Sequence, residues 1–215
     1  MACKWFTLFL ILFTFACEPK LLKQNDRVVF IGDSITASGI WTDGFITIVN
    51  RTIQEKYPDL NVTVAGAGVA GDRSTDVLAR IDRILTLAPT VTVLLVGIND
   101  VWGTLNGTGN SIPVYYGTML KIVDRLDDSS RVILCTPTTI GEDHSGWDLL
   151  DEYSNWVRKI AVDNKIQLID LRDVFAKQLK DNTKAFGVLT IDGVHPNIAG
   201  SRLIADKILE GLCVN

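Results

Sequence analysis

Short runs of apolar, often β-branched residues alternate along the chain with longer stretches in which apolar residues recur at helical spacing. Several of the short runs are apolar on both faces, which is typical of strands buried between two layers of helices. Ser74 is the expected N-cap of the helix that begins there. The strand-like runs cover residues 27–31, 61–65, 90–96, 131–135 and 167–169. The helical stretches cover residues 44–56, 74–85, 114–126, 149–164, 174–179 and 197–212.

This alternation of strand and helix predicts an α/β fold with a parallel sheet and helices on both faces. Ligands of such sheets bind beyond the carboxyl ends of the strands. Catalytic residues are therefore expected just after the strand-like runs and not inside the helices. The chain has 215 residues, 47% of them hydrophobic, which is enough for one sizeable core and too little for two comfortable domains. Residues 18–215 are expected to form a single domain.

The N-terminus differs from the rest of the chain. Lys4 precedes an uncharged apolar run over residues 5–16, which is too short to span a bilayer comfortably, and Ala16 stands just before Cys17. This arrangement predicts an export signal over residues 1–17, and hence a secreted, periplasmic or membrane-anchored protein. The residues before Cys17 loosely resemble a bacterial lipobox, although its usual leucine is missing, so a lipid anchor on Cys17 and simple secretion both stay open. A buried N-terminal helix is the less favoured alternative.

Charge and cysteine content restrict the classes of partner and bond. The formal net charge is -4, with the charges scattered, so no basic surface for nucleic acid is expected. Beyond the export segment only Cys135 and Cys213 remain. Cys135 ends an apolar run, where a buried free thiol is commoner than a disulfide. A free thiol is therefore the favoured prediction.

Candidate chemistry follows three of the strand-like runs. The first run leads directly into Asp33 and Ser34, although Gly-Asp-Ser alone is ordinary turn chemistry. The second leads into a glycine block that ends at Gly71, where a backbone N–H can approach a ligand closely. The third leads into Asn99 and Asp100, and a carboxamide at that edge is a neutral donor for an oxyanion.

The last block, Asp192-Gly193-Val194-His195-Pro196, precedes the final helix. His195 is one of only two histidines, and the other, His144, lies in a polar stretch that favours a solvated loop. A carboxylate three residues before His195 can reach the imidazole Nδ1 and select its tautomer. The Nε2 atom is then free to take a proton from Ser34, which needs such a base to become nucleophilic.

These four blocks, taken together in this order, resemble the SGNH (GDSL-like) hydrolase family. The resemblance implies a three-layer α/β/α, doubly wound, flavodoxin-like fold with a five-stranded parallel sheet. It implies a serine esterase that works through an acyl-enzyme. Ile35 stands where the GDSL signature has leucine, a packing position. The roles implied are Ser34 as nucleophile, His195 as general base, Asp192 as its partner, the amides of Ser34 and Gly71 with the Asn99 side chain as oxyanion hole, and Asp33 and Asp100 as supporting residues.

Parts of the sequence also match two other classes of protein, a nucleotide- or cofactor-binding protein and a glycan-binding protein without activity. The glycine block at residues 66–71 matches G-x-G-x-x-G, but the acidic residue that a dinucleotide site needs about 20 positions later is missing, since the next strand-like run is followed first by Asp100. A phosphate loop at residues 32–38 leaves Asp192 and His195 unexplained. The interpretation as a glycan-binding protein without activity is disfavoured, because each expected catalytic residue type is present.

The substrate is predicted from aromatic residues and from the resemblance. Trp102 and Trp41 are candidate substrate-binding residues, and Trp147 and Trp156 are weaker ones. No apolar lid or cap domain is visible, so a shallow cleft for a short acyl group is expected. Relatives of this compact kind resemble carbohydrate O-acetylesterases, with lysophospholipase or thioesterase activity as the alternative. No cofactor is expected and no metal, because two distant histidines without a cysteine cluster form no usual ligand set.

Overall fold

A computed structural model describes residues 22–141, 146–179 and 187–214. The expected export segment with Cys17, and also His144, lie outside the described residues, so those expectations remain predictions. Among the described residues, no helix has the length and apolar character needed to cross a membrane.

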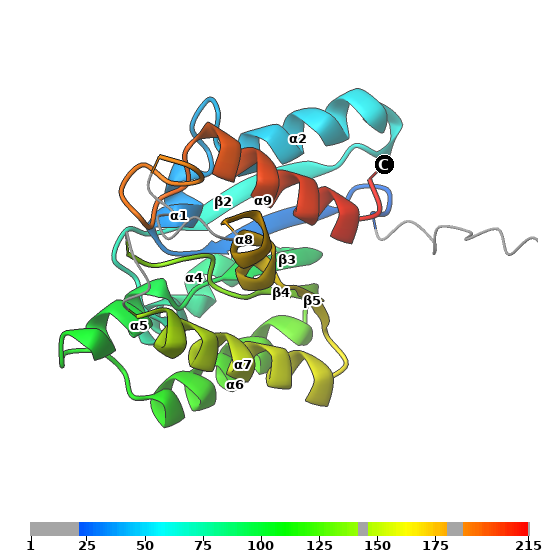
Figure 1. The fold of residues 1–215 in the computed structure, drawn as a ribbon. Helices are drawn as coiled ribbons and strands as arrows, with labels where there is room; N and C mark the ends of the chain where they lie inside the picture. Colours follow the sequence, from blue (N-terminus) through cyan, green and yellow to red (C-terminus); the bar gives the residue numbers. More distant parts are fainter. Residues whose placement is uncertain (1–21, 142–145, 180–186, 215) are drawn as a thin grey trace, which may run out of the picture.

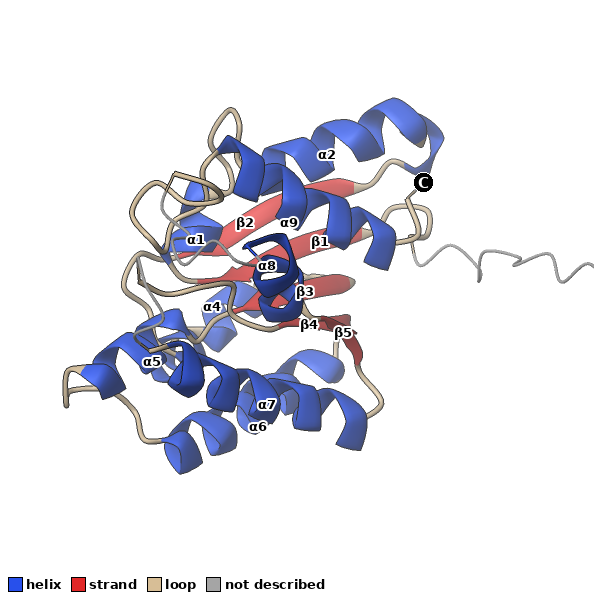
Figure 2. Cartoon of the chain, viewed as in Figure 1, coloured by secondary structure: helices blue, strands red, loops and turns tan. Residues whose placement is uncertain are grey.

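The five strands of the described chain form one all-parallel sheet in the order β2-β1-β3-β4-β5 (Figure 2). The strand β3 is buried on both faces, whereas the edge strand β2 is partly exposed. The predicted α/β sandwich is therefore confirmed. The strands are β1 (Arg27–Gly32), β2 (Thr63–Gly68), β3 (Val91–Leu95), β4 (Arg131–Cys135) and β5 (Gln167–Ile169).

Helices cover both faces of the sheet (Figure 1). On one face α2 packs against α9, and on the other α6 packs against α3 and α7. The core is apolar and includes an edge-on contact between Phe30 of β1 and Phe45 of α2, with ring centroids 5.8 Å apart. The helices are α1 (Ser34–Ser38), α2 (Phe45–Lys56), α3 (Ser74–Ala79), α4 (Ile81–Leu85), α5 (Ile98–Leu105), α6 (Ile112–Asp127), α7 (Trp147–Asp163), α8 (Leu171–Leu179) and α9 (Ile198–Gly211), with a 3-10 turn η1 (Pro58–Leu60).

The structure corrects the helix predicted over residues 74–85. It is broken at Arg80, whose φ of -108° and ψ of 12° separate α3 from α4. The Ser74 N-cap is also wrong, since Arg73 is the N-cap and the Ser74 hydroxyl donates instead to Asp100 of another helix. Hydrophobic periodicity could not reveal either feature, because both depend on polar contacts with distant parts of the chain.

The two cysteines in the described residues are free thiols, as favoured from the sequence. Cys135 ends β4 and is fully buried. Burial raises the pKa of the Cys135 thiol to about 12, because the thiolate would lose its hydration. The thiol therefore contributes packing and not reactivity.

Candidate active site

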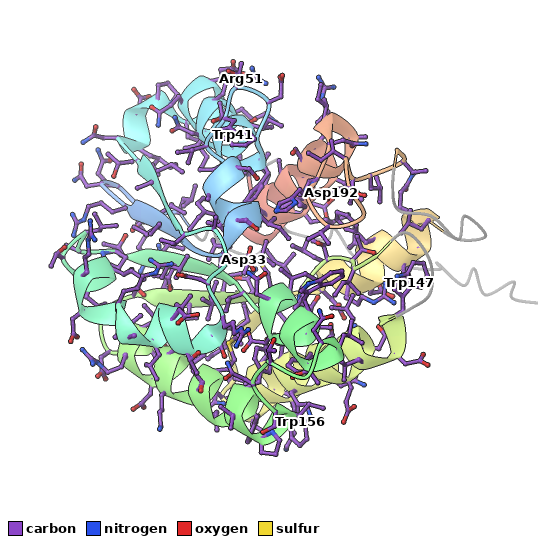
Figure 3. All side chains as sticks on the ribbon, turned by 90° about the vertical axis from the view of Figure 1, so that its left-hand side faces the viewer. Asp33, Trp41, Arg51, Trp147, Trp156 and Asp192 are labelled. Atoms are coloured by element: carbon purple, nitrogen blue, oxygen red, sulfur yellow. The ribbon has the colours of Figure 1, made fainter. Side chains whose placement is uncertain are left out.

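Three side chains from the two ends of the described chain form one hydrogen-bonded row at the carboxyl edge of the sheet. The His195 Nε2 atom lies 2.8 Å from the Ser34 Oγ, and its Nδ1 lies 2.6 Å from the Asp192 Oδ2. Viewed onto this edge (Figure 3), the loop that carries Asp192 lies beside the central region around Asp33. The structure thus brings together residues 161 positions apart in the chain.

Ser34 is held by the strand-to-helix junction after β1. The Asp33 carboxylate accepts a hydrogen bond of 2.9 Å from the Ile35 N–H and so caps α1. Ser34 is consequently the first residue of α1, where backbone N–H groups lack partners within the helix. Gly68 permits the close approach of β2 to this junction, since a Cβ there would lie 2.3 Å from the Ala37 nitrogen.

His195 is held by a tight loop between Thr190 and Pro196, which form an isolated antiparallel bridge. Gly193 has a φ of +89°, a conformation that glycine adopts without steric cost, and its N–H donates to the buried Thr190 hydroxyl at 3.0 Å. The Asp192 Oδ1 atom accepts from the His195 N–H at 2.7 Å. One carboxylate therefore fixes both the backbone and the ring of His195.

Asp192 remains ionised at neutral pH. Partial burial by itself raises the pKa of this carboxyl, but the hydrogen bonds from the N–H groups of His195 and Val194 and from the His195 ring outweigh it and lower the pKa. An ionised carboxylate at Nδ1 favours the tautomer that leaves Nε2 able to accept a proton from Ser34.

Asp33 is a second carboxyl near the row, but its environment is different. It is 1% exposed, and burial raises its pKa to about 7, against the opposing effects of the Ile35 N–H and the charge of His195. The negative charge of Asp100 raises it further. Asp33 therefore changes charge near neutral pH behind the candidate nucleophile.

The Asp33→Asn variant tests this burial. The folded protein keeps the Asp33 proton up to about pH 7, whereas the unfolded chain releases it near the ordinary aspartate pKa of 3.8. Because the folded state holds this proton more tightly, the proton contributes to the free energy of unfolding. That contribution has its full value below about pH 4 and decreases as the pH rises to about 7. Relative to the variant, the wild-type free energy of unfolding should fall by at most about 4 kcal/mol across this window. Urea titrations at pH 4, 5.5 and 7.5 measure it, and a constant difference would contradict the assigned burial.

The two further predicted oxyanion donors, Gly71 and Asn99, follow β2 and β3, the strands on either side of β1 in the sheet. Gly71 has a φ of +84° and is exposed, and apart from its chain neighbours no atom of the described residues lies within 4 Å of an added Cβ. Asn99 lies in the first turn of α5, and its Nδ2 donates to the Asp72 carbonyl at 2.9 Å. That bond occupies one of the two amide hydrogens and leaves the second available for an incoming oxyanion.

Asp100 joins the helices around the site. It is completely buried, and its carboxylate accepts from the Ser74 N–H at 2.9 Å, the Ser74 hydroxyl at 2.7 Å and the Asn110 Nδ2 at 2.8 Å. Burial raises its pKa, while these hydrogen bonds oppose the shift. The carboxyl ties the N-terminus of α5, which carries Asn99, to the start of α3.

The expectation that catalytic residues stand outside the helices is only partly right. Ser34 and Asn99 lie in the first turns of α1 and α5, two short helices that the sequence analysis missed. Both helices follow directly from the ends of β1 and β3, so the residues still lie at the carboxyl edge. With five residues in α1 and eight in α5, these helices are too short for hydrophobic periodicity to distinguish them from loops.

The tryptophans fall into two groups. Trp102 is 52% exposed and lies three residues after Asn99 on α5, and Trp41 is 68% exposed in the loop after α1. Trp156 instead packs its ring 4.8 Å from that of Tyr116, at the margin opposite Trp41 in Figure 3. The Trp147 Nε1 donates to the Ile140 carbonyl, beneath the guanidinium of Arg172.

The ion pair between Arg80 and Asp72, which directly follows Gly71, was not predicted from the sequence. The Arg80 Nε donates to the Asp72 carboxylate at 2.6 Å, and its Nη2 donates to the Gly32 carbonyl at 3.0 Å. Asp72 follows the glycine block that was singled out, but no local pattern pairs it with Arg80, eight positions later at the far end of α3.

Comparison with known proteins agrees with this geometry. A model of the GDSL-like lipase/acylhydrolase family matches residues 30–203. The chain is 27% identical over 209 residues to an acetylxylan esterase of Geobacillus stearothermophilus, covering 88% of this chain and 94% of the relative. A solved acetyl xylan esterase, AlAXEase, is 37% identical, with a TM-score of 0.80 over 86% of this chain and 98% of its own. LAE5, an α/β hydrolase from the metagenome of Lake Arreo in Spain, is 25% identical, with a TM-score of 0.82 over 91% and 99%.

The family match spans β1 to α9 and therefore includes all four sequence blocks from which the resemblance was drawn. The TM-scores of 0.80 and 0.82 over most of each chain show that these solved structures share the fold of this protein. This chain thus belongs to the GDSL-like lipase/acylhydrolase family, as its SGNH-like blocks predicted.

Proposed function

We propose that this protein is a serine esterase that removes short acyl groups, above all acetyl, from carbohydrate. The observation that carries the proposal is the row of hydrogen bonds from Asp192 through His195 to the Ser34 hydroxyl. Membership of an acylhydrolase family and similarity to acetylxylan esterases support an ester as the substrate. Solved variants of the Geobacillus enzyme in which a serine, an aspartate or a histidine is replaced by alanine are called catalytic mutants, which supports the same three residue types here.

The reaction begins with Ser34 as nucleophile. His195 Nε2 removes the hydroxyl proton while the Ser34 Oγ attacks the ester carbonyl, and the carbonyl π electrons move onto oxygen. Asp192 stabilises the protonated imidazole. The bond between the acetyl carbon and the sugar oxygen then breaks as the imidazole gives its proton to that oxygen, so the sugar leaves with a hydroxyl and an acetyl group stays on Ser34. Water, deprotonated by His195, attacks the acyl carbon, the bond to the Ser34 Oγ breaks as His195 returns the proton to Oγ, and acetic acid is released and ionises to acetate.

The tetrahedral oxyanion requires donors that are already in place. We assign this role to the N–H groups of Ser34 and Gly71 and to the free amide hydrogen of Asn99. Preorganised donors stabilise the transition state more than the neutral carbonyl, since the negative charge on oxygen is present only after attack. Asp100 supports this arrangement through its bonds to α3, next to Asn99.

Exposed aromatic side chains support a carbohydrate as the alcohol part of the substrate. Trp102 shares a helix with Asn99, and residues three apart on a helix are neighbours on its surface. Trp41 follows the helix that begins at Ser34, and Ile191, which is 58% exposed, directly precedes Asp192. Exposed aromatic rings suit stacking on sugar rings, and we assign Trp102 and Trp41 to substrate binding.

A series of nitrophenyl esters tests the acyl specificity. We expect kcat/KM to be highest for acetate and to fall by at least tenfold by eight carbons, because a shallow site does not bury a long chain. Acetate release from acetylated xylooligosaccharides, measured in parallel, tests the alcohol part. A preference for eight or more carbons over acetate would contradict this proposal and favour a lysophospholipase or thioesterase.

A further inference from the structure

Arg80 bonds two of the segments that carry the proposed oxyanion donors, the end of β1 and the loop after β2. It lies between α3 and α4, where the helix is interrupted, and its side chain is 21% exposed. Its Nε donates to the Asp72 carboxylate at 2.6 Å and its Nη2 to the Gly32 carbonyl at 3.0 Å. One guanidinium therefore joins the end of β1 to the loop after β2.

The two acceptors lie next to the proposed oxyanion donors. Gly32 is two residues before Ser34, and its carbonyl also accepts from the Val69 N–H at 3.1 Å. Asp72 directly follows Gly71, and the Asp72 N–H returns to the Val69 carbonyl at 3.2 Å. The guanidinium and Val69 thus hold the Gly71 loop against the end of β1.

The Asn99 side chain, at the start of α5, is held by the backbone of Asp72. The Asp72 carbonyl accepts the Asn99 Nδ2 hydrogen at 2.9 Å, so the direction of the Asn99 amide depends on the position of Asp72. Asp72 is 9% exposed and Arg80 bonds its side chain, while Asn99 bonds its main chain. A movement of Asp72 would displace the Gly71 N–H and turn the Asn99 amide at the same time.

We propose that Arg80 is a positioning residue that aligns the oxyanion donors by clamping Asp72 to the Gly32 carbonyl. This inference rests on the proposed esterase function. The planar guanidinium is suited to the task because it presents Nε and Nη2 in a rigid geometry to two acceptors, whereas a lysine ammonium offers one compact charge. The interruption between α3 and α4 places this side chain toward the clamp instead of along a continuous helix.

The test compares Arg80→Met with Arg125→Met. Arg125 of α6 pairs with Asp82 of α4 on the outer surface, so its loss removes an exposed ion pair to the helix that follows Arg80 without touching the site. With nitrophenyl acetate, Arg80→Met should lower kcat by roughly 10-fold to 100-fold and leave KM within about twofold, since small misplacements of transition-state groups have effects of this size. Arg125→Met should match wild type. Arg80→Lys should fall between Arg80→Met and wild type.

Two further readouts separate positioning from simple loss of stability. Inhibition by phenylboronic acid, which forms a tetrahedral adduct on a serine hydroxyl, should weaken by a similar factor in Arg80→Met. The double variant Arg80→Met, Asp72→Asn removes the unpaired carboxylate and should regain resistance to urea, but not kcat. Full recovery of kcat in the double variant would overturn the proposal, because Arg80 would then serve only to neutralise Asp72.

The NMR signals of the Asn99 side-chain amide, identified by their loss in Asn99→Ala, report the geometry without any activity. They should shift in Arg80→Met and stay unchanged in Arg125→Met. Unchanged signals together with wild-type boronate affinity would overturn the positioning role even in an active enzyme. Conversely, a wild-type protein that hydrolyses no ester would refute the proposed function, while a shift of the Asn99 signals would still show the clamp.

Discussion

Replacement of Ser34 by alanine should lower kcat for acetyl release by on the order of 10⁴-fold to 10⁶-fold, without unfolding the protein. The Ser34 hydroxyl forms the acyl-enzyme in the proposed reaction, and among the described residues it is hydrogen-bonded to His195. His195→Ala should have a comparable effect, because the serine then keeps its proton during attack. Initial rates with nitrophenyl acetate and with acetylated xylooligosaccharide measure both losses.

The effects of substitutions within one catalytic unit on kcat are not additive. The double variant Ser34→Ala, His195→Ala should therefore have a kcat within a few-fold of that of either single variant. Ser38→Ala is the matched control. It removes a hydroxyl from the same helix α1, where Ser38 donates only to the Ile35 carbonyl, and should retain wild-type activity. A Ser34→Ala protein that retains more than about a tenth of the wild-type rate would refute the assigned nucleophile.

Replacement of Asn99 by alanine should lower kcat by roughly 10²-fold to 10³-fold while changing KM little. The amide hydrogen not used by Asp72 is the proposed oxyanion donor, and it interacts more strongly with the developing charge than with the ester carbonyl. Asn99→Asp should be slower still, because a carboxylate there would repel the oxyanion. Steady-state kinetics with nitrophenyl acetate, combined with boronate inhibition, separate these effects.

Asn106→Ala controls for the loss of an asparagine side chain at the other end of α5. The Asn106 amide is exposed and donates to the Trp102 carbonyl within its own turn, so its removal should leave kcat at the wild-type value. If Asn99→Ala raised KM and left kcat unchanged, the residue would bind substrate and transition state equally, and the oxyanion role would be wrong.

The strand and helix pattern predicted the sheet well because its signals are local and strong. The run 131–135 became β4 with the same bounds, and the three-residue run 167–169 became β5. Apolar residues on both faces are a direct consequence of burial between helix layers, as in β3. Local sequence was insufficient for α1 and α5, whose few residues contain less than three turns of periodic pattern.

The sequence by itself determined the fold class, the family resemblance and the residue types of the candidate site, because hydrophobic period and short motifs are properties of neighbouring residues. It also indicated the contact between Asp192 and His195, which are three positions apart. Only the tertiary structure decided the contact between His195 and Ser34, the burial of Asp33, and the clamp of Arg80 on Asp72 and Gly32. These depend on strands and loops that are distant in sequence and are brought together by the packing of the sheet, so no local pattern encodes them.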